Sequence, residues 1–162
     1  MPNSDEAQER HRWWLLRDAP RADSGVLYYP EAAASEVWVQ SIVEVVPFLV
    51  STRDFAPADM QYRMLRSHLW DPESGLYGER YDVDKETWVI ATPSATSNVA
   101  VAEAMARALR EGGDLTPAEM RGRWQRETRE LVAACSSLDL DSVSAALLAR
   151  AVTLGTDDGW LS

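Results

Sequence analysis

The sequence is poor in the residues that form disulfides and metal sites. Cys135 is its one cysteine, and the two histidines, His11 and His68, lie far apart. A single cysteine excludes an internal disulfide and a thiolate metal cluster, and separated histidines argue against a histidine zinc site. No apolar run reaches the roughly 18 residues of a membrane span, and nucleotide loops and Ser-His-Asp order are also missing. We therefore expect no metal ion, no cofactor and no membrane insertion.

Basic residues are scarce as well. The chain has 16 Lys and Arg against 26 Asp and Glu, a net charge of −10, and Lys85 is its single lysine. This balance argues against nucleic acid or an anionic membrane as a partner, because both attract positive charge. The polar, acidic start of the sequence indicates no signal peptide, so we expect a cytoplasmic protein. A length of 162 residues with 46% apolar content predicts one folded domain, residues 1–162.

Alternating β patterns are nearly absent, apart from short runs after Gly25 and around Trp88. Helical periodicity dominates instead, and it predicts an all-α fold of helical hairpins. Thr92-Pro93, a Thr116–Glu119 capping box and Asp139 or Asp141 mark the starts of the last three helices. The predicted helices cover about residues 5–17, 35–51, 54–70, 92–111, 116–136 and 139 or 141 to 155, and the last has a core face of Leu140, Val143, Leu147, Ala151 and Leu154.

The predicted helix at 35–51 is apolar nearly all the way round and forms the centre of the chain. Its strongly polar residues, Glu36, Gln40 and Glu44, fall on one line at i, i+4 and i+8. Burying an unpaired carboxylate is costly, so this line faces water, a partner or a cavity. In a cavity, Glu36 or Glu44 would be an acid/base group with a raised pKa. The alternative is one solvated stripe on a packed helix.

The order of several short motifs resembles a known family. Glu36-Val37-Trp38-Val39-Gln40 runs on to Pro47-Phe48-Leu49, and Trp70–Tyr77 contains an acid, Ser-Gly, Leu and Tyr. Tyr81-Asp82, Trp88 and Asn98 follow, before an alanine-rich helix. This order resembles the six-hairpin (α/α) toroid glycosidases, in particular the unsaturated glucuronyl and rhamnogalacturonyl hydrolases. The resemblance covers roughly residues 25–111 and implies a carbohydrate-like ligand.

The sequence departs from that family at three points. The family's catalytic aspartate, which protonates the substrate and activates water, falls at Gln40. Its Asn-Gly-Trp segment is reduced to Asn98-Val99-Ala100. A ring of six hairpins also needs about twice this length, so the resemblance implies about half a toroid.

Three acids at alternating positions, Asp82, Asp84 and Glu86, allow further hypotheses. They could hold Ca²⁺ or Mg²⁺, or protonate an alkene, because the segment partly resembles the Asp-rich loops of toroid-shaped terpene cyclases. The alternative is a solvated loop.

Two functions follow from the sequence. The first is a small acid/base enzyme acting on a carbohydrate-like ligand or a specialised metabolite, with its pocket between the second and fourth helices. The second is a non-catalytic helical module that binds a partner or assembles as a homodimer. For the enzyme, the candidate catalytic residues are Glu36, Glu44 and Asp82, and the candidate ligand-binding residues are Trp38, Gln40, Tyr81, Trp88 and Asn98.

Overall fold

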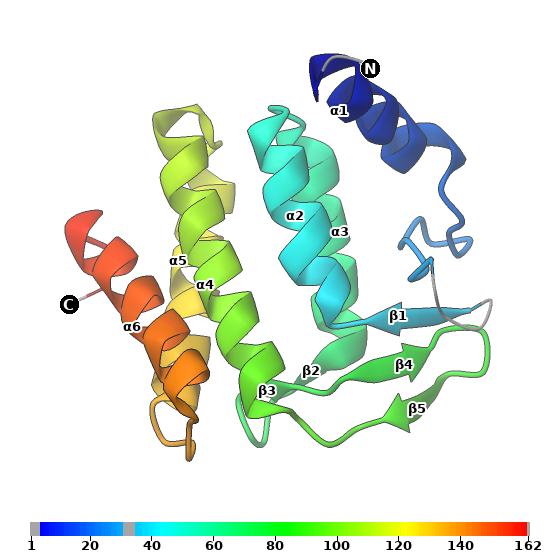
Figure 1. Cartoon of the computed structure of the whole chain (residues 1–162). Coiled ribbons are helices and arrows are strands. Elements are labelled where there is room, and N and C mark those ends of the chain that lie inside the picture. Colours follow the sequence, from blue (N-terminus) through cyan, green and yellow to red (C-terminus); the bar gives the residue numbers. More distant parts are fainter. Residues whose placement is uncertain (1–3, 31–34, 162) are drawn as a thin grey trace.

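A computed structural model describes residues 4–30 and 35–161, and helices make up most of the described chain (Figure 1). The helices are α1 (Ser4–Trp13), α2 (Gln40–Ser51), α3 (Phe55–Leu69), α4 (Ala95–Gly112), α5 (Ala118–Cys135) and α6 (Ser142–Asp157), with a π-helical turn η1 (Trp14–Asp18) and a 3₁₀ turn η2 (Gly113–Leu115). The strands are β1 (Glu36–Trp38), β2 (Trp70–Asp71), β3 (Leu76–Tyr77), β4 (Arg80–Asp82) and β5 (Thr87–Ile90). The predicted helical class is confirmed.

The helices after α1 form two layers. In Figure 1, α2, α4 and α6 lie side by side, and α3 and α5 lie behind them. Helix α4 is in the middle, since it packs against α2, α5 and α6. Its alanines allow these close approaches, and Val101, Ala104 and Ala106 have no exposed surface. The consecutive pairs α2–α3 and α4–α5 are the helical hairpins that the sequence predicted.

The predicted helix at 35–51 begins too early. Residues Glu36–Trp38 form strand β1, which pairs antiparallel with β4 so that Glu36 is opposite Asp82 and Trp38 is opposite Arg80. Pairing with a distant strand and complete burial of Val37 override the local helical pattern. Glu36 therefore does not share a helical line with Gln40 and Glu44, which lie in α2.

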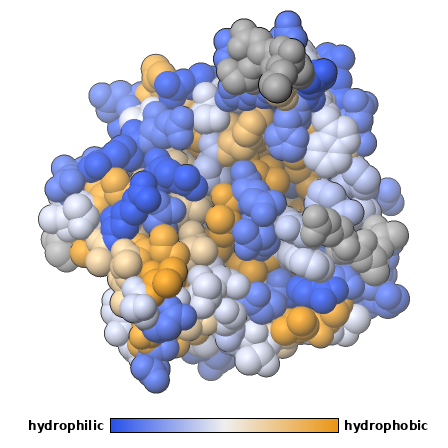
Figure 2. Space-filling model, viewed as in Figure 1, coloured by the Kyte–Doolittle hydropathy of each residue, from blue (hydrophilic) through white to orange (hydrophobic). Residues whose placement is uncertain are grey.

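The three-stranded sheet has the order β1-β4-β5 and lies at one end of α2, α3 and α4 (Figure 1). Strand β5 is an edge strand. Its Trp88, Val89 and Ile90 are 37%, 42% and 41% exposed, and hydrophobic residues show on this part of the surface in Figure 2. The run around Trp88 was predicted to be extended, whereas β1, β3 and β4 were not predicted.

Helix starts agree with the sequence only in part. Asp141 caps α6, because its carboxylate accepts a hydrogen bond from Ser144 N at 2.7 Å. Helix α4 begins after Ser94, two residues later than Thr92, and the Ser94 hydroxyl accepts from Ser97 N. Helix α5 lies where the capping box predicted it, but no side-chain hydrogen bond caps its start.

Most of the predicted core face of α6 is confirmed, since Ala151 is buried and Leu147 and Leu154 pack partly buried against the core, but Val143 is not part of it. Val143 is 66% exposed, whereas Ser144, Leu148 and Ala151 are buried. Val152 is also 37% exposed. Helix α6 thus presents apolar side chains to solvent, in addition to the face that packs on α4.

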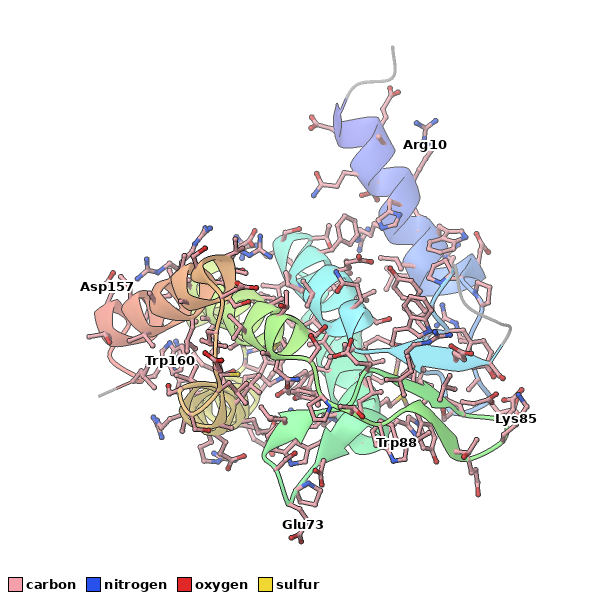
Figure 3. The ribbon with its side chains drawn as sticks, turned by 60° about the horizontal axis from the view of Figure 1, so that its bottom comes forward. Arg10, Glu73, Lys85, Trp88, Asp157 and Trp160 are labelled. Atoms are coloured by element: carbon pink, nitrogen blue, oxygen red, sulfur yellow. The ribbon has the colours of Figure 1, made fainter. Side chains whose placement is uncertain are left out.

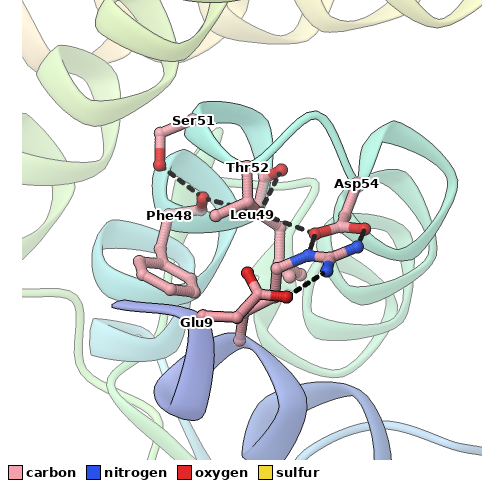
Figure 4. Close-up of polar contacts among 7 residues, drawn as sticks. Glu9, Phe48, Leu49, Ser51, Thr52 and Asp54 are labelled. Carbon is pink, nitrogen blue, oxygen red and sulfur yellow. Dashed lines mark hydrogen bonds and ion pairs between the residues drawn. The ribbon is translucent and has the colours of Figure 1, made fainter. Parts of the chain in front are cut away.

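Helix α1 is attached to the α2–α3 corner by charge. Arg12 donates from Nε and Nη2 to the two oxygens of Asp54 at 2.6 and 2.8 Å (Figure 4). The hydrogen bonds from Arg12, opposed by burial, hold the pKa of Asp54 below its usual value. His11 packs edge-on against Phe48 of α2, with ring centroids 4.8 Å apart. None of the helices in the described residues is long and apolar enough to cross a membrane.

Candidate functional site

A groove opens at the first turn of α2, where β1, β4 and β5 meet the helix. Its volume is about 290 Å³. We call it the Trp38 groove, and the described residues that line it are Tyr29, Trp38, Val39, Gln40, Glu79, Arg80 and Ile90. Two of these, Trp38 and Gln40, were predicted to bind ligand.

Trp38 forms the fixed wall of the groove. Its indole stacks on Tyr29, with centroids 4.3 Å apart and planes inclined by 8°, and the Arg80 guanidinium lies 4.4 Å from the ring centre. The indole N–H donates to Glu36 Oε2 at 2.8 Å. These contacts immobilise the ring before any ligand arrives, which lowers the entropic cost of binding.

Glu36 is held in an ion pair beneath this wall. Arg80 donates to Glu36 Oε2 from Nε at 2.9 Å and from Nη2 at 2.5 Å, and Glu36 as a residue is 6% exposed. Burial raises the pKa of Glu36, but the hydrogen bonds from Arg80 and Trp38 outweigh it, so the net pKa is lowered. The raised pKa that the sequence predicted for Glu36 is therefore wrong, and the group is a poor proton donor near neutral pH.

Asp82 is likewise occupied by structural contacts. Its carboxylate accepts from Lys85 Nζ at 2.6 Å and from Ser35 Oγ at 2.7 Å, and the Lys85 backbone N–H donates to it as well. These hydrogen bonds, that of Lys85 first, lower the pKa of Asp82 to about 2. Its neighbour Asp84 accepts from Tyr28 Oη at 2.9 Å. Across the described residues no three His, Cys, Asp or Glu side chains gather as a metal-ligand group.

Gln40 and Glu44 do lie together on one face of α2. Gln40 Nε2 donates to Glu44 Oε1 at 3.2 Å, and no described residue donates to the Gln40 side-chain carbonyl. Gln40 faces the Trp38 groove, while Glu44 lines a second pocket between α2, α1 and η1. This pair is the part of the predicted polar line that the structure retains.

The other predicted ligand residues lie elsewhere. Asn98 has no exposed surface. Its side chain exchanges hydrogen bonds with the backbone of Tyr77 at 2.7 and 2.9 Å, so it is occupied by structural contacts. Tyr81 stacks on His68 and meets Trp88 edge-on, with centroids 5.3 and 5.4 Å away. Figure 3 shows Trp88 and Lys85 at the sheet end of the molecule. Asn98, Tyr81 and Trp88 are not among the described residues that line the Trp38 groove.

The expected pocket between the second and fourth helices is also misplaced. Helices α2 and α4 pack directly on each other, and Val46 and Ala102 are completely buried. Instead, the groove next to Gln40 lies against the sheet, and the pocket next to Glu44 lies against the N-terminal segment.

Sequence reasoning missed the other five groove residues, of which Tyr29, Glu79 and Arg80 carry polar groups. Glu79 accepts from Ser94 N and Ser97 Oγ at the start of α4, at 3.1 and 2.9 Å. Tyr29 precedes a proline in an apparent loop, and Arg80 joins the site only through its register with Trp38. A tyrosine next to the predicted extended run after Gly25 was the one available signal.

Solved structures of similar fold include a glycoside hydrolase and a polysaccharide lyase. A family 105 glycoside hydrolase from C. acetobutylicum is similar with a TM-score of 0.80 and 15% identity, over 98% of this chain and 52% of that one. A possible family 105 member from Klebsiella pneumoniae is similar with a TM-score of 0.80 and 13% identity, over 97% of this chain and 48% of that one. A polysaccharide lyase is similar with a TM-score of 0.70 and 16% identity, over 99% of this chain and 50% of that one. The chain thus spans about half the length of these proteins. No family model and no curated protein sequence matches it.

Identities this low establish the fold alone. The two-layer hairpins described above match these structures over nearly the whole chain. The chain therefore has the fold of about half of an (α/α) six-hairpin toroid, of the kind found in family 105 glycoside hydrolases.

Proposed function

We propose that this chain binds a carbohydrate-like, polyhydroxylated ligand in the Trp38 groove without carrying out acid/base catalysis there. The groove combines an aromatic wall with polar side chains, the combination typical of small-molecule sites. Its size of about 290 Å³ suits a ligand of one or two sugar rings. The toroid fold shared with a glycoside hydrolase and a polysaccharide lyase supports this ligand class.

The state of the carboxylates favours binding over catalysis. A general acid for a glycosidic bond needs a raised pKa and a free path to the substrate. Glu36 and Asp82 have neither, because each is buried in an ion pair that lowers its pKa. The position that corresponds to the catalytic aspartate in the resemblance is Gln40, whose amide cannot transfer a proton.

The observation that carries the proposal is the Gln40 amide beside the Tyr29–Trp38 stack. Gln40 donates to Glu44 and keeps its carbonyl oxygen available to a ligand hydroxyl. Trp38 provides an apolar ring edge, since Tyr29 and Arg80 lie over the faces of its indole and hold it in place. A sugar ring offers both matching features, since it has apolar C–H groups for the indole edge and hydroxyls for the amide.

Calorimetric titration with neutral and acidic oligosaccharides tests this function. We expect saturable binding of at least one saccharide, and weakening of about tenfold in Gln40→Ala, the loss of a hydrogen bond worth about 1.4 kcal/mol. Gln8→Ala, an exposed glutamine on α1, is the matched control and should bind like the wild type. Turnover of unsaturated uronides is measured in parallel. If the wild type hydrolyses these uronides and Glu44→Gln does not, the proposal of binding without catalysis is wrong and Glu44 acts as the acid.

A second candidate function is self-assembly. Helix α6 exposes Val143 and Val152, and apolar side chains exposed on a protein surface can mark an interaction site. We propose that a second copy of the chain covers this face. Two copies would supply the helical hairpins of the longer ring-shaped structures.

A further inference from the structure

The pocket on the other side of Tyr29 has a different chemical character from the Trp38 groove. Its volume is about 80 Å³, and it lies between α2 and the N-terminal segment. We call it the Glu44 pocket. Aromatic rings make up much of its wall, and the residues on which the argument depends are His11, Trp14, Tyr28, Tyr29 and Glu44.

The aromatic rings of the Glu44 pocket are held by other side chains, and those of His11, Tyr28 and Tyr29 by partners outside the pocket. His11 stacks against Trp14 at 5.8 Å and packs edge-on against Phe48 at 4.8 Å. The Tyr28 hydroxyl donates to Asp84 Oδ1 at 2.9 Å, and Tyr29 stacks on Trp38. The walls are therefore in place in the free protein, and a ligand need not order them.

Among the described residues that line the pocket, Glu44 is the one carboxylate; it is solvent-exposed and has no cationic partner. Glu44 accepts a hydrogen bond from the neutral amide of Gln40, and no arginine or lysine is among the described residues that line the pocket. The nearby Arg21 donates to the backbone carbonyls of Ala19 and Leu15 instead. Arg80 is likewise engaged by Glu36 and Trp38.

Rigid aromatic walls around one uncompensated carboxylate have a defined preference. Ring faces attract cations through their quadrupoles, and the carboxylate adds direct attraction together with a strong hydrogen-bond acceptor. The same groups disfavour anions, as does the net charge of −10. We infer that the Glu44 pocket binds an organic ammonium group.

This inference rests on the proposed function and narrows its ligand class. The two pockets share Tyr29, and the Gln40–Glu44 hydrogen bond connects them. A single ligand that extends around Tyr29 would place a sugar ring in the Trp38 groove and a positively charged substituent beside Glu44. The ligand class is an amine-bearing saccharide, such as an oligomer with free amino sugars.

A matched set of β-1,4-linked disaccharides tests the inference by calorimetry. Di-glucosamine carries two amines, its di-N-acetyl form carries neutral amides, and cellobiose carries hydroxyls in their place. At about pH 6 the amines are protonated, and we expect di-glucosamine to bind about tenfold more tightly than the other two, from a cation–π and carboxylate contribution of roughly 1–2 kcal/mol. This preference should weaken as salt is raised.

Variants assign the preference to the pocket. In Glu44→Gln the ratio of di-glucosamine to cellobiose affinity should fall from about ten to near one. Glu111→Gln, an exposed glutamate at the end of α4, should keep the wild-type ratio. If Glu44→Gln is poorly folded by circular dichroism, Glu44→Asp, which keeps the charge on a shorter side chain, should retain part of the preference.

The outcomes separate the two proposals. Equal affinities for all three disaccharides in the wild type would overturn the ammonium inference and leave saccharide binding intact. A preference that persists in Glu44→Gln would overturn the assignment to this pocket. If no disaccharide binds, but tetramethylammonium does so in a Glu44-dependent manner, the ammonium site stands and the saccharide function fails.

Discussion

Two carboxylates beside the Trp38 groove, Glu36 and Asp82, are kept ionised by their neighbours. Glu36 anchors both Arg80 and the Trp38 indole, and Asp82 joins Ser35 to Lys85 at the end of the sheet. Both groups therefore shape the site without contacting a ligand in the groove. At this scale the structure assigns them positioning roles.

Replacing Glu36 with glutamine should destabilise the protein. The variant leaves the Arg80 guanidinium without its charge partner and weakens the hold on Trp38. Because Arg80 retains some contact with water, we expect the free energy of unfolding to fall by about 1–3 kcal/mol in urea denaturation. Glu111→Gln, at an exposed position, should stay within about 0.5 kcal/mol of the wild type. An unchanged unfolding midpoint in Glu36→Gln would show that the ion pair contributes nothing net.

Acid should weaken the protein partly through Asp82. A carboxyl whose pKa is lower in the folded state, here about 2, stabilises the fold above its unfolded pKa of about 4, and that contribution is lost as the pH falls through 2. The free energy of unfolding should therefore drop less between about pH 4 and pH 2 in Asp82→Asn than in the wild type. Asp23→Asn, at an exposed site, should follow the wild-type curve. Parallel curves for wild type and Asp82→Asn would contradict this assignment.

At the scale of elements, the helices could be predicted, whereas of the strands only β5, around Trp88, was predicted to be extended. Helical periodicity and caps are local signals, so α3 to α6 were located within a few residues. Strand β1 depends on β4, whose Arg80 and Asp82 lie more than 40 positions away, and its three residues carry no pattern of their own. For the same reason Tyr29, Glu79 and Arg80 could not be assigned to the site, because only the folded register brings them to Trp38 and Gln40.

Gly78, between β3 and β4, is a place where one methyl group should disturb the sheet. A Cβ at this position would lie 2.4 Å from Trp88 Cζ3 and 2.8 Å from the carbonyl oxygen of Ala91. The backbone cannot yield as a side chain can, so Gly78→Ala should cost about 1–3 kcal/mol of unfolding free energy in urea denaturation. The variant should also show a larger change in tryptophan fluorescence on mild heating than the wild type.

The control for this substitution is Gly122, inside α5. A Cβ there would have only the flexible Arg126 Nη1 nearby, at 3.8 Å. Alanine at a helical position restricts the unfolded chain, so Gly122→Ala should stabilise by about 0.5–1 kcal/mol. If both substitutions change stability in the same direction, the close approach at Gly78 is not the controlling factor.

At the scale of the whole molecule, the fold leaves one flank of the helical layer uncovered. Helix α6 closes the row α2-α4-α6, and its far side meets no described element (Figure 1). Hydrophobic residues show on the surface near the start of α6 in Figure 2. In longer toroids, further hairpins continue such a row. A symmetric pair of chains is the simplest way for identical copies to cover this face.

Self-association through α6 should therefore depend on its exposed valines. We expect the wild-type mass, measured by light scattering over rising concentration, to increase from monomer toward dimer, and Val152→Glu to remain monomeric because a carboxylate would have to be desolvated in the interface. Val89→Glu alters an equally exposed valine on β5 and should still dimerise. If Val89→Glu loses the dimer and Val152→Glu keeps it, the interface lies on the edge strand β5 and not on α6. An edge strand has unpaired backbone groups that can pair with a second chain. A wild-type protein that stays monomeric at every concentration would exclude assembly by either surface.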